Sequence, residues 1–304
     1  MKLNFLLYFI LFLLGSCSLT DENDSGKIRV VTTTSIVTDI VKNIGGDKIE
    51  VSGLMGAGID PHLYKASEGD VMKLANAEMI IYGGLHLEGK LVDVFSKIER
   101  LGKHPVDLGA TIPEHLLLRS KDFGGNYDPH VWFNVELIKI ESKSVAEAFK
   151  KYDSINADYY QANLDAYLVK LDDLQAEIIE MVQTLPKESR HLVTAHDAFG
   201  YFGDAYGFKV IGLQGLSTAT EAGVKDMRRV SDYIVKHHIK SIFIESSVPV
   251  KTIEALQMAV RSRGHQVNIG GMLYSDALGN EGEEEGTYIG MMRYNVKSII
   301  DGLK

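Results

Sequence analysis

The chain of 304 residues has one cysteine, Cys17, and no excess of positive charge. A single cysteine excludes an intramolecular disulfide. The formal net charge of -9 at pH 7 argues against nucleic acid as a partner, because such a partner must be met by cationic side chains. Beyond the first residues, no run is long and apolar enough to cross a bilayer. The 45% hydrophobic content is typical of a globular protein, and the length suits two modest domains or one large one.

The first 16 residues have the pattern of a secretory signal. A basic start is followed by a short apolar core and then by small residues. The Leu-Gly-Ser-Cys sequence that ends at Cys17 resembles a bacterial lipoprotein signal, in which the cysteine is acylated and becomes the new N-terminus. We therefore expect lipidation of Cys17 and a flexible polar tether over residues 17–27. The alternative is an ordinary signal with an unrelated cysteine.

Short apolar runs alternate with helix-like segments in both halves of the chain. Strands are expected over residues 28–35, 49–55, 79–83 and 105–108, and again over 191–195, 209–213, 241–245 and 266–272. Helices are expected over 35–44, 67–76, 87–98, 199–206, 220–237 and 250–263. This alternation is typical of βαβ units. It predicts an α/β fold with two lobes, residues 28–152 and 186–304, each with a four-stranded, mainly parallel sheet flanked by helices.

Residues 153–184, between these halves, contain no glycine and no proline. From Leu164 to Leu185, apolar residues recur at steps of three and four, which places them on one face of a helix. The segment 153–185 therefore predicts one long, rigid helix that joins the lobes and ends at Pro186. The alternative is two helices with a break near Asp172.

Four segments far apart in the chain each offer a metal ligand beside a turn signal. The candidate ligands are His62, His130, His196 and Asp276. The first two stand in Asp-Pro-His sequences, each followed by an apolar and an aromatic residue. Three imidazoles and one carboxylate suit a divalent cation such as zinc. Because open α/β sheets bind ligands beyond the carboxyl ends of their strands, we expect one ion in the crevice between the lobes.

Three other features compete for a functional role. His86 is the alternative ligand among the remaining histidines. Glu245, at the end of an apolar run, is the candidate to hold the far nitrogen of a ligating histidine; a strand-end charge that faces water is the alternative. The acidic run over residues 282–286 is expected to be a solvated loop rather than a second metal site.

The sequence resembles the solute-binding proteins that serve manganese and zinc ABC importers. The matching stretches are 58–64, 128–132, 194–202 and 286–292, and the similarity runs over nearly all of residues 28–304. The resemblance implies two α/β lobes bridged by one rigid helix. It also implies an extracytoplasmic lipoprotein, anchored to the bacterial membrane through Cys17, with a membrane permease as its partner.

The same resemblance maps the metal ligands onto His62, His130, His196 and Asp276, as in the treponemal subtype with three histidines and one aspartate. Streptococcal manganese-binding relatives carry a glutamate in place of His196. Imidazole suits zinc, and the Irving–Williams order also places zinc above manganese. Zinc-dedicated relatives, however, usually carry a histidine-rich loop, and residues 118–127 contain no histidine. We therefore expect one divalent ion as cargo, zinc or manganese.

The expected function is capture and delivery of this ion by a monomer that is not an enzyme. Four protein ligands saturate a tetrahedral ion and leave no position for a substrate. One alternative is a zinc-dependent hydrolase with the same site, although the chain has no His-Glu-x-x-His sequence. Another is a surface adhesin stabilised by metal. We expect the protein to stay folded without metal because each lobe has its own core, and its affinity to fall as pH drops through about 6.5.

Overall fold

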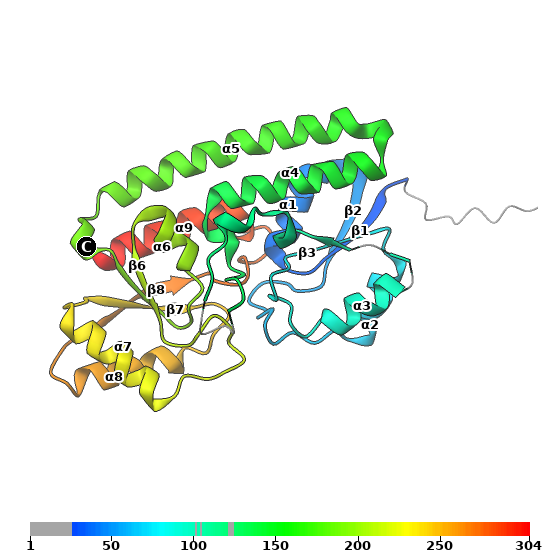
Figure 1. The fold of residues 1–304 in the computed structure, drawn as a ribbon. Coiled ribbons are helices and arrows are strands. Elements are labelled where there is room, and N and C mark those ends of the chain that lie inside the picture. Colours follow the sequence, from blue (N-terminus) through cyan, green and yellow to red (C-terminus); the bar gives the residue numbers. More distant parts are fainter. Residues whose placement is uncertain (1–25, 101, 104, 121–124) are drawn as a thin grey trace, which may run out of the picture.

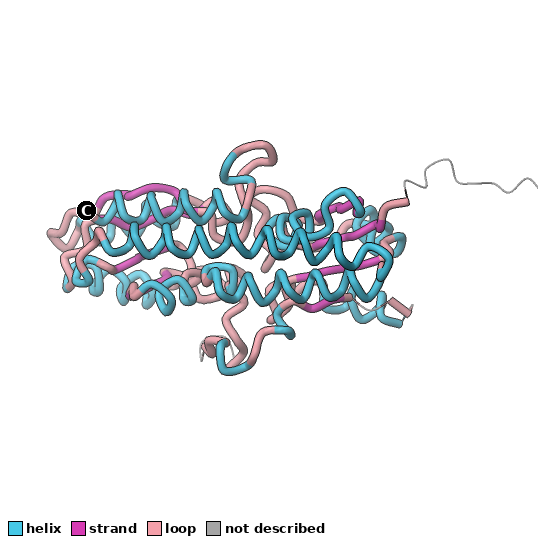
Figure 2. The backbone as a smooth tube through the Cα atoms, turned by 90° about the horizontal axis from the view of Figure 1, so that it is seen from above, coloured by secondary structure: helices cyan, strands magenta, loops and turns pink. Residues whose placement is uncertain are grey.

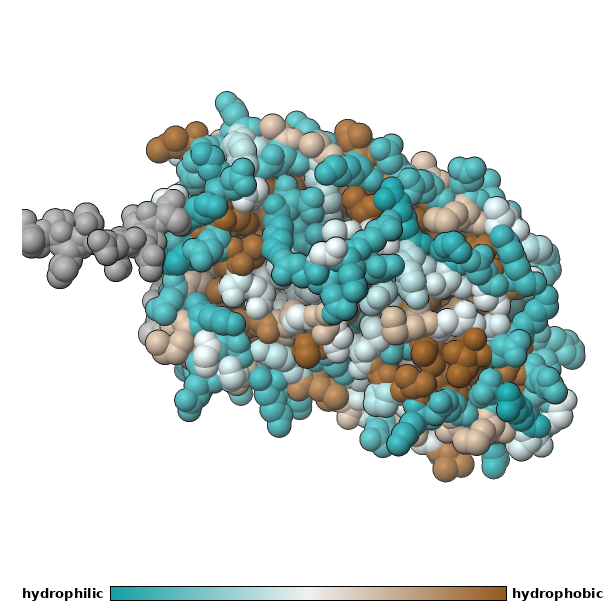
Figure 3. All heavy atoms as spheres, turned by 180° about the vertical axis from the view of Figure 1, so that it is seen from behind, coloured by the Kyte–Doolittle hydropathy of each residue, from teal (hydrophilic) through white to brown (hydrophobic). Residues whose placement is uncertain are grey.

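The computed structural model describes residues 26–100, 102–103, 105–120 and 125–304. The predicted signal peptide, Cys17 and most of the predicted tether lie outside these residues. Seen from behind, the surface is mostly hydrophilic, with some apolar side chains gathered over the second lobe (Figure 3). Within the described residues, no helix has the length and apolar character needed to span a bilayer.

The first lobe contains the predicted four-stranded parallel sheet (Figure 1). Its strands are β1 (Ile28–Thr32), β2 (Ile49–Gly53), β3 (Met79–Tyr82) and β4 (Val106–Asp107), in the order β2-β1-β3-β4. Every pair in this sheet is parallel. The flanking helices are α1 (Ser35–Gly45), α2 (Glu68–Asn76) and α3 (Val92–Arg100).

The second lobe has four parallel strands in two hydrogen-bonded pairs instead of the one four-stranded sheet predicted. The strands are β5 (His191–Thr194), β6 (Lys209–Gly212), β7 (Ser241–Glu245) and β8 (Asn268–Leu273), with α6 (Gly200–Tyr206), α7 (Val224–Lys236) and α8 (Lys251–Arg261) around them. β5 pairs with β6 and β7 with β8, and β5 and β7 are in contact. A register shift lies between Ile242 and Phe243. Because Ile242 pairs with Ile269 and Phe243 pairs with Gly271, the extra residue of this bulge is Gly270 of β8, and the ladder between β7 and β8 is interrupted there.

The predicted linking helix is a single helix, α5 (Ala157–Gln183), of 27 residues. It runs without interruption through Asp172, so the alternative of two helices is wrong. At 1.5 Å per residue it is about 40 Å long, and it lies along both lobes (Figure 1). Its Asn163 Nδ2 donates to the Ile44 carbonyl of the first lobe at 2.9 Å. Its Gln175 Oε1 accepts from the Tyr206 hydroxyl of the second lobe at 2.7 Å.

Two further helices were not predicted from the sequence. They are α4 (Val135–Tyr152) and α9 (Tyr288–Leu303), which lie beside α5 when the molecule is seen from above (Figure 2). The buried face of α4 includes Glu141 and Ser142, and that of α9 includes Gly290 and Asn295. These polar and small residues interrupt the apolar stripe by which a helix is usually recognised.

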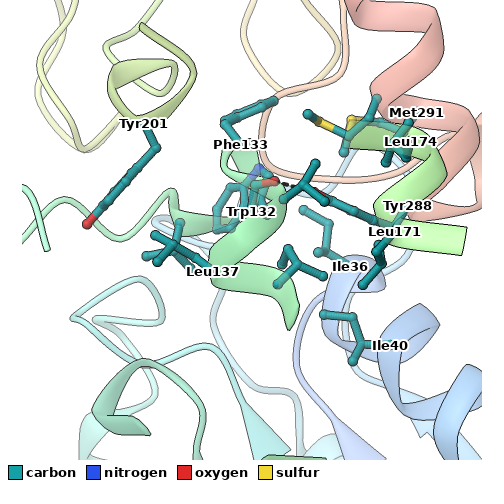
Figure 4. Close-up of a cluster of buried hydrophobic side chains, with 14 of the residues drawn as sticks. Ile36, Ile40, Trp132, Phe133, Leu137, Leu171, Leu174, Tyr201, Tyr288 and Met291 are labelled. Carbon is teal, nitrogen blue, oxygen red and sulfur yellow. Dashed lines mark hydrogen bonds between the residues drawn. The ribbon is translucent and has the colours of Figure 1, made fainter. Parts of the chain in front are cut away.

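The largest buried cluster belongs to both lobes at once. It contains residues of α1, of the turn before α4, of α5 and of α9 (Figure 4), among them Ile36, Ile40, Trp132, Phe133, Leu171, Leu174, Tyr288 and Met291. Two smaller clusters belong to one lobe each. The expectation that each lobe has its own core is therefore incomplete, because helices that contact both lobes also bury their apolar faces in a common core.

Substitution of Leu171 tests this shared core. Leu171 is fully buried on α5, so Leu171→Ala should lower the free energy of unfolding by about 2–5 kcal/mol through lost contacts and a cavity. The matched control is Val169→Ala on the same helix, where the side chain is 59% exposed and the expected change is within about 0.5 kcal/mol. Urea unfolding followed by circular dichroism measures both. Equal effects of the two substitutions would contradict the shared core.

Candidate metal centre

The four candidate ligands predicted from the sequence come together in the structure. His62 lies in the loop after β2, His196 just after β5 and Asp276 just after β8, while His130 lies in the loop before α4. Their ligand atoms all lie within 4.8 Å of one another. The side chain of His62 is 5% exposed and the other three are 0% exposed. The carboxyl ends of strands in both lobes thus contribute to one buried point, as the sequence analysis expected.

Four distances describe the geometry of this point. The Nε2 atom of His130 lies 3.3 Å from Nε2 of His62, 3.4 Å from Nε2 of His196 and 3.4 Å from Oδ1 of Asp276. Nε2 of His196 lies 3.3 Å from the same Oδ1. In a tetrahedral zinc site with bonds of about 2.0–2.1 Å, neighbouring ligand atoms are about 3.3–3.4 Å apart. These four spacings match such a site, and the remaining pairs of ligand atoms lie within 4.8 Å.

Asp276 has one oxygen without a hydrogen bond in the part of the chain that the structure describes. Its Oδ2 accepts a hydrogen bond from the Ser247 hydroxyl at 3.0 Å. Its Oδ1 is buried and has no hydrogen-bond partner among the described residues, although the two histidine nitrogens are close. A buried acceptor without a donor is costly and rare in proteins. A cation at the centre of the four side chains would supply the missing partner.

Two buried carboxylates hold the far nitrogens of two of the histidines. Nδ1 of His130 lies 2.7 Å from Oδ1 of Asp128, and Nδ1 of His196 lies 2.5 Å from Oε2 of Glu245. Glu245 is 2% exposed, so the alternative of a strand-end charge that faces water is wrong. A carboxylate on Nδ1 fixes the ring orientation and leaves Nε2 free to bind an ion.

The sequence did not lead us to predict the role of Asp128, although the repeated Asp-Pro-His pattern indicates a role for the aspartate in both copies. In both copies the aspartate accepts a hydrogen bond from the backbone N–H of the histidine two residues later. The distances are 2.8 Å from His62 N to Asp60 Oδ1 and 2.9 Å from His130 N to Asp128 Oδ1. Aspartate commonly stabilises turns in this way, and proline restricts the residue between. The pattern therefore sets the backbone that presents each histidine.

The remaining candidates do not join this group. Among the described residues, one group of three or more possible ligands converges, and His86 is not a member of it. His86 instead lines a cavity of about 490 Å³ in the first lobe, beside Tyr82 and Asp107. The acidic run is also outside the group, and Glu283 and Glu284 are exposed, as expected of a solvated loop.

The charges around the site determine where protons sit when no ion is bound. Burial lowers the pKa of His62 to about 3. Burial also opposes protonation of His130, but the Asp128 carboxylate outweighs it and raises the pKa to about 9. Burial likewise disfavours the charged form of His196, but Asp276 and Glu245 together raise its pKa well above the usual value. Burial would raise the pKa of Asp276, yet His196 and His130 hold it well below its ordinary range. An arriving cation must therefore displace protons.

The arrangement suits the enclosure of an ion better than catalysis at an ion. Four donor atoms converge, and all four side chains are buried. Metal-dependent hydrolysis needs an open coordination position for water or substrate. Four protein ligands already complete a tetrahedral shell. The geometry therefore favours a site that holds an ion and shields it from solvent.

Comparison with known proteins identifies the family. The family described as zinc-uptake complex component A, periplasmic (ZnuA), matches residues 30–302. Zinc-binding protein TroA of Treponema pallidum is 47% identical over 285 residues, which cover 93% of this chain and 91% of TroA. Manganese-binding lipoprotein MntA of Bacillus subtilis is 43% identical over 298 residues, which cover 97% of each chain.

The solved structures agree with this assignment. The periplasmic zinc-binding protein TroA of Treponema pallidum matches the present structure with a TM-score of 0.89 at 47% sequence identity. The match covers 91% of this chain and 99% of that one. The two α/β lobes and the long linking helix are thus shared with a structure of known fold. The chain belongs to the ZnuA family.

Proposed function

We propose that this protein captures one divalent transition-metal ion, zinc or manganese, outside the cytoplasm and delivers it to the permease of an ABC importer. The ligands are His62, His130, His196 and Asp276. The observation that carries this proposal is the convergence of three imidazole nitrogens and a carboxylate oxygen of Asp276 at one buried point. The family and the names of its relatives support the same function, since TroA is described as zinc-binding and MntA as manganese-binding.

The donor set bears on the choice of ion. Three nitrogens and one carboxylate favour zinc by intrinsic affinity, and carboxylate oxygen also suits manganese. Supply in the cell, rather than affinity alone, decides which ion a site of this kind takes up. The cargo is therefore zinc or manganese, bound one ion at a time and not retained as a catalytic cofactor.

The rest of the chain supports a tethered carrier. The protein is lipidated at Cys17, and residues 17–27 connect it to the membrane. Lobes over residues 28–152 and 186–304 are joined by the linking helix within 153–185, and the protein acts as a monomer without enzymatic activity. A hydrolase is less well supported because the four donors are buried and complete a shell. An adhesin that needs metal for stability is less well supported because the large common core consists of apolar side chains that pack without an ion.

Removal of one ligand should abolish tight binding. His196→Ala removes one of four donor atoms, and loss of a supporting partner alone typically costs 10- to 100-fold in metal affinity. We expect zinc affinity to fall by more than about 100-fold, measured by competition with a chelating dye. The control is His115→Ala, an exposed histidine that does not belong to the group of four ligands. Circular dichroism should show both variants folded, and unchanged zinc affinity in His196→Ala would refute the ligand assignment.

Glu245→Gln tests the carboxylate behind His196. The glutamine oxygen can still accept from the His196 backbone N–H, but its amide donates where the carboxylate accepts from Nδ1. The imidazole is then driven to the tautomer with hydrogen on Nε2, which cannot bind an ion. Zinc affinity should fall by about 10- to 100-fold in the same dye competition. An affinity equal to that of the unaltered protein would show that Glu245 does not set the tautomer.

The affinity should depend on pH over a higher range than the sequence alone suggested. The ion binds neutral imidazole, and the pKa of His130 is raised to about 9 by Asp128. Protons therefore compete with the ion at every pH below about 9, and affinity falls steadily from pH 9 to pH 7 rather than only below 6.5. Calorimetry at pH 7 in buffers of different ionisation enthalpy should detect at least one proton released per ion. Binding without proton release at pH 7 would contradict this.

A further inference from the structure

The two lobes are joined around the metal site in two different ways. On the side of the common core, the Trp132 Nε1–H donates to the Ser275 carbonyl at 2.9 Å, and the Tyr288 hydroxyl donates to the Trp132 carbonyl at 2.7 Å. The Leu278 N–H donates to the Ser35 hydroxyl at 2.9 Å. These bonds fix the segment that carries Asp276 against elements of the first half of the chain. The positions of His130 and Asp276 are thus built into the buried core.

Among the described residues, one side-chain hydrogen bond joins the loop that carries His62 to the second lobe. The Thr218 hydroxyl donates to Oδ2 of Asp60 at 2.5 Å, across 158 positions of sequence. Of the hydrogen bonds that the structure describes for residues 54–66, this is the one that reaches the second lobe. The other oxygen of Asp60 accepts from the His62 backbone N–H at 2.8 Å. The Asp60 carboxylate therefore connects the backbone of a metal ligand to the opposite lobe.

The segment that leads to Thr218 is hydrogen-bonded to the residues on either side of His196. The Gln214 N–H donates to the Ala195 carbonyl at 2.9 Å, and the Asp197 N–H donates to the Gly215 carbonyl at 3.3 Å. His196 lies between Ala195 and Asp197. The bond from Thr218 to Asp60 thus ties the loop of His62 to the loop of His196.

The orientation of the His62 ring has less support than the orientations of the His130 and His196 rings. His130 and His196 each have a carboxylate on Nδ1, whereas Nδ1 of His62 has no hydrogen-bond partner among the described residues. The chain just before it, Gly56 to Ile59, is exposed, and Gly58 has a φ of +68°. The orientation of His62 therefore rests on its backbone, and Asp60 holds that backbone.

We propose that Thr218 is a positioning residue that, through Asp60, holds the His62 loop against the second lobe and thereby sets the rate at which the captured ion leaves. The inference rests on the metal-capture function proposed above. The ion cannot escape while His62 closes the site, because the other three ligands are completely buried. The Thr218 bond lowers the population of the open loop and slows release.

Dissociation kinetics of the zinc-loaded protein test this role. Thr218→Val removes the hydroxyl but keeps the branched shape, whereas Thr218→Ser keeps the hydroxyl. The matched control is Thr220→Val, an exposed residue of the same segment without a described hydrogen bond. Stopped-flow transfer of zinc to a chromogenic chelator should be about tenfold faster from Thr218→Val, as expected for loss of a hydrogen bond to a charged acceptor. Thr218→Ser and Thr220→Val should stay within about twofold of the unaltered protein.

A double variant shows whether Thr218 acts through Asp60. Zinc should leave the double variant Asp60→Ala/Thr218→Val no faster than it leaves Asp60→Ala alone, because the bond is already lost. Rescue of the slow dissociation by Thr218→Ser, together with the missing additivity in the double variant, separates this role from a general loss of stability. Unchanged dissociation from Thr218→Val, or additive effects in the double variant, would overturn this inference alone. An unaltered protein that binds no zinc would overturn the capture function and this inference with it.

Discussion

The metal site depends on one unusual electrostatic feature, a buried carboxylate oxygen that lies beside imidazole nitrogens and accepts no hydrogen bond from the described residues. Oδ1 of Asp276 lies 3.3 Å from Nε2 of His196 and 3.4 Å from Nε2 of His130. Burial of a charged oxygen without a hydrogen bond costs free energy unless a ligand binds to it. A divalent cation at the common centre would offset this cost, because it would bind all four donor atoms at once. The cost is also lowered before the ion arrives, because His130 and His196 hold protons and Asp276 stays ionised beside them.

The fold supports this feature with two kinds of rigidity. The common core and the long helix α5 keep the halves of the site at a fixed separation, so that the donors need little rearrangement when the ion binds. Buried carboxylates then fix two of the three rings at their far nitrogens. His62 is the exception, because it stands on an exposed loop and is held through Asp60. A site that must both retain and release its ion needs one ligand that can move, and the structure points to this one.

The parts of the fold that follow from local pattern could be predicted from the sequence. Strands such as β5 and β7 are short apolar runs that end in turns, and α5 shows a regular apolar stripe without glycine or proline. The helices α4 and α9 could not be predicted in this way, because Glu141 and Asn295 occupy positions on their buried faces. The division of the second lobe's strands into two pairs also could not be predicted, because tertiary contacts decide which strands pair, although Gly270-Gly271 marks the bulge in β8.

The four candidate ligands could be named from the sequence because turn signals mark the ends of the segments that carry them. Their supporting partners were only partly accessible. Glu245 stood out as a charge at the end of an apolar run, whereas Asp128 and Thr218 look like ordinary turn and loop residues until their partners across the fold are seen. A contact between residues 158 positions apart is set by tertiary structure alone.

X-ray absorption spectroscopy at the zinc edge of the loaded protein tests the central claim most directly. The account predicts four-coordinate zinc with three imidazole nitrogens and one carboxylate oxygen at about 2.0–2.2 Å, and no bound water. A shell with fewer than three imidazoles, or one completed by water, would contradict it.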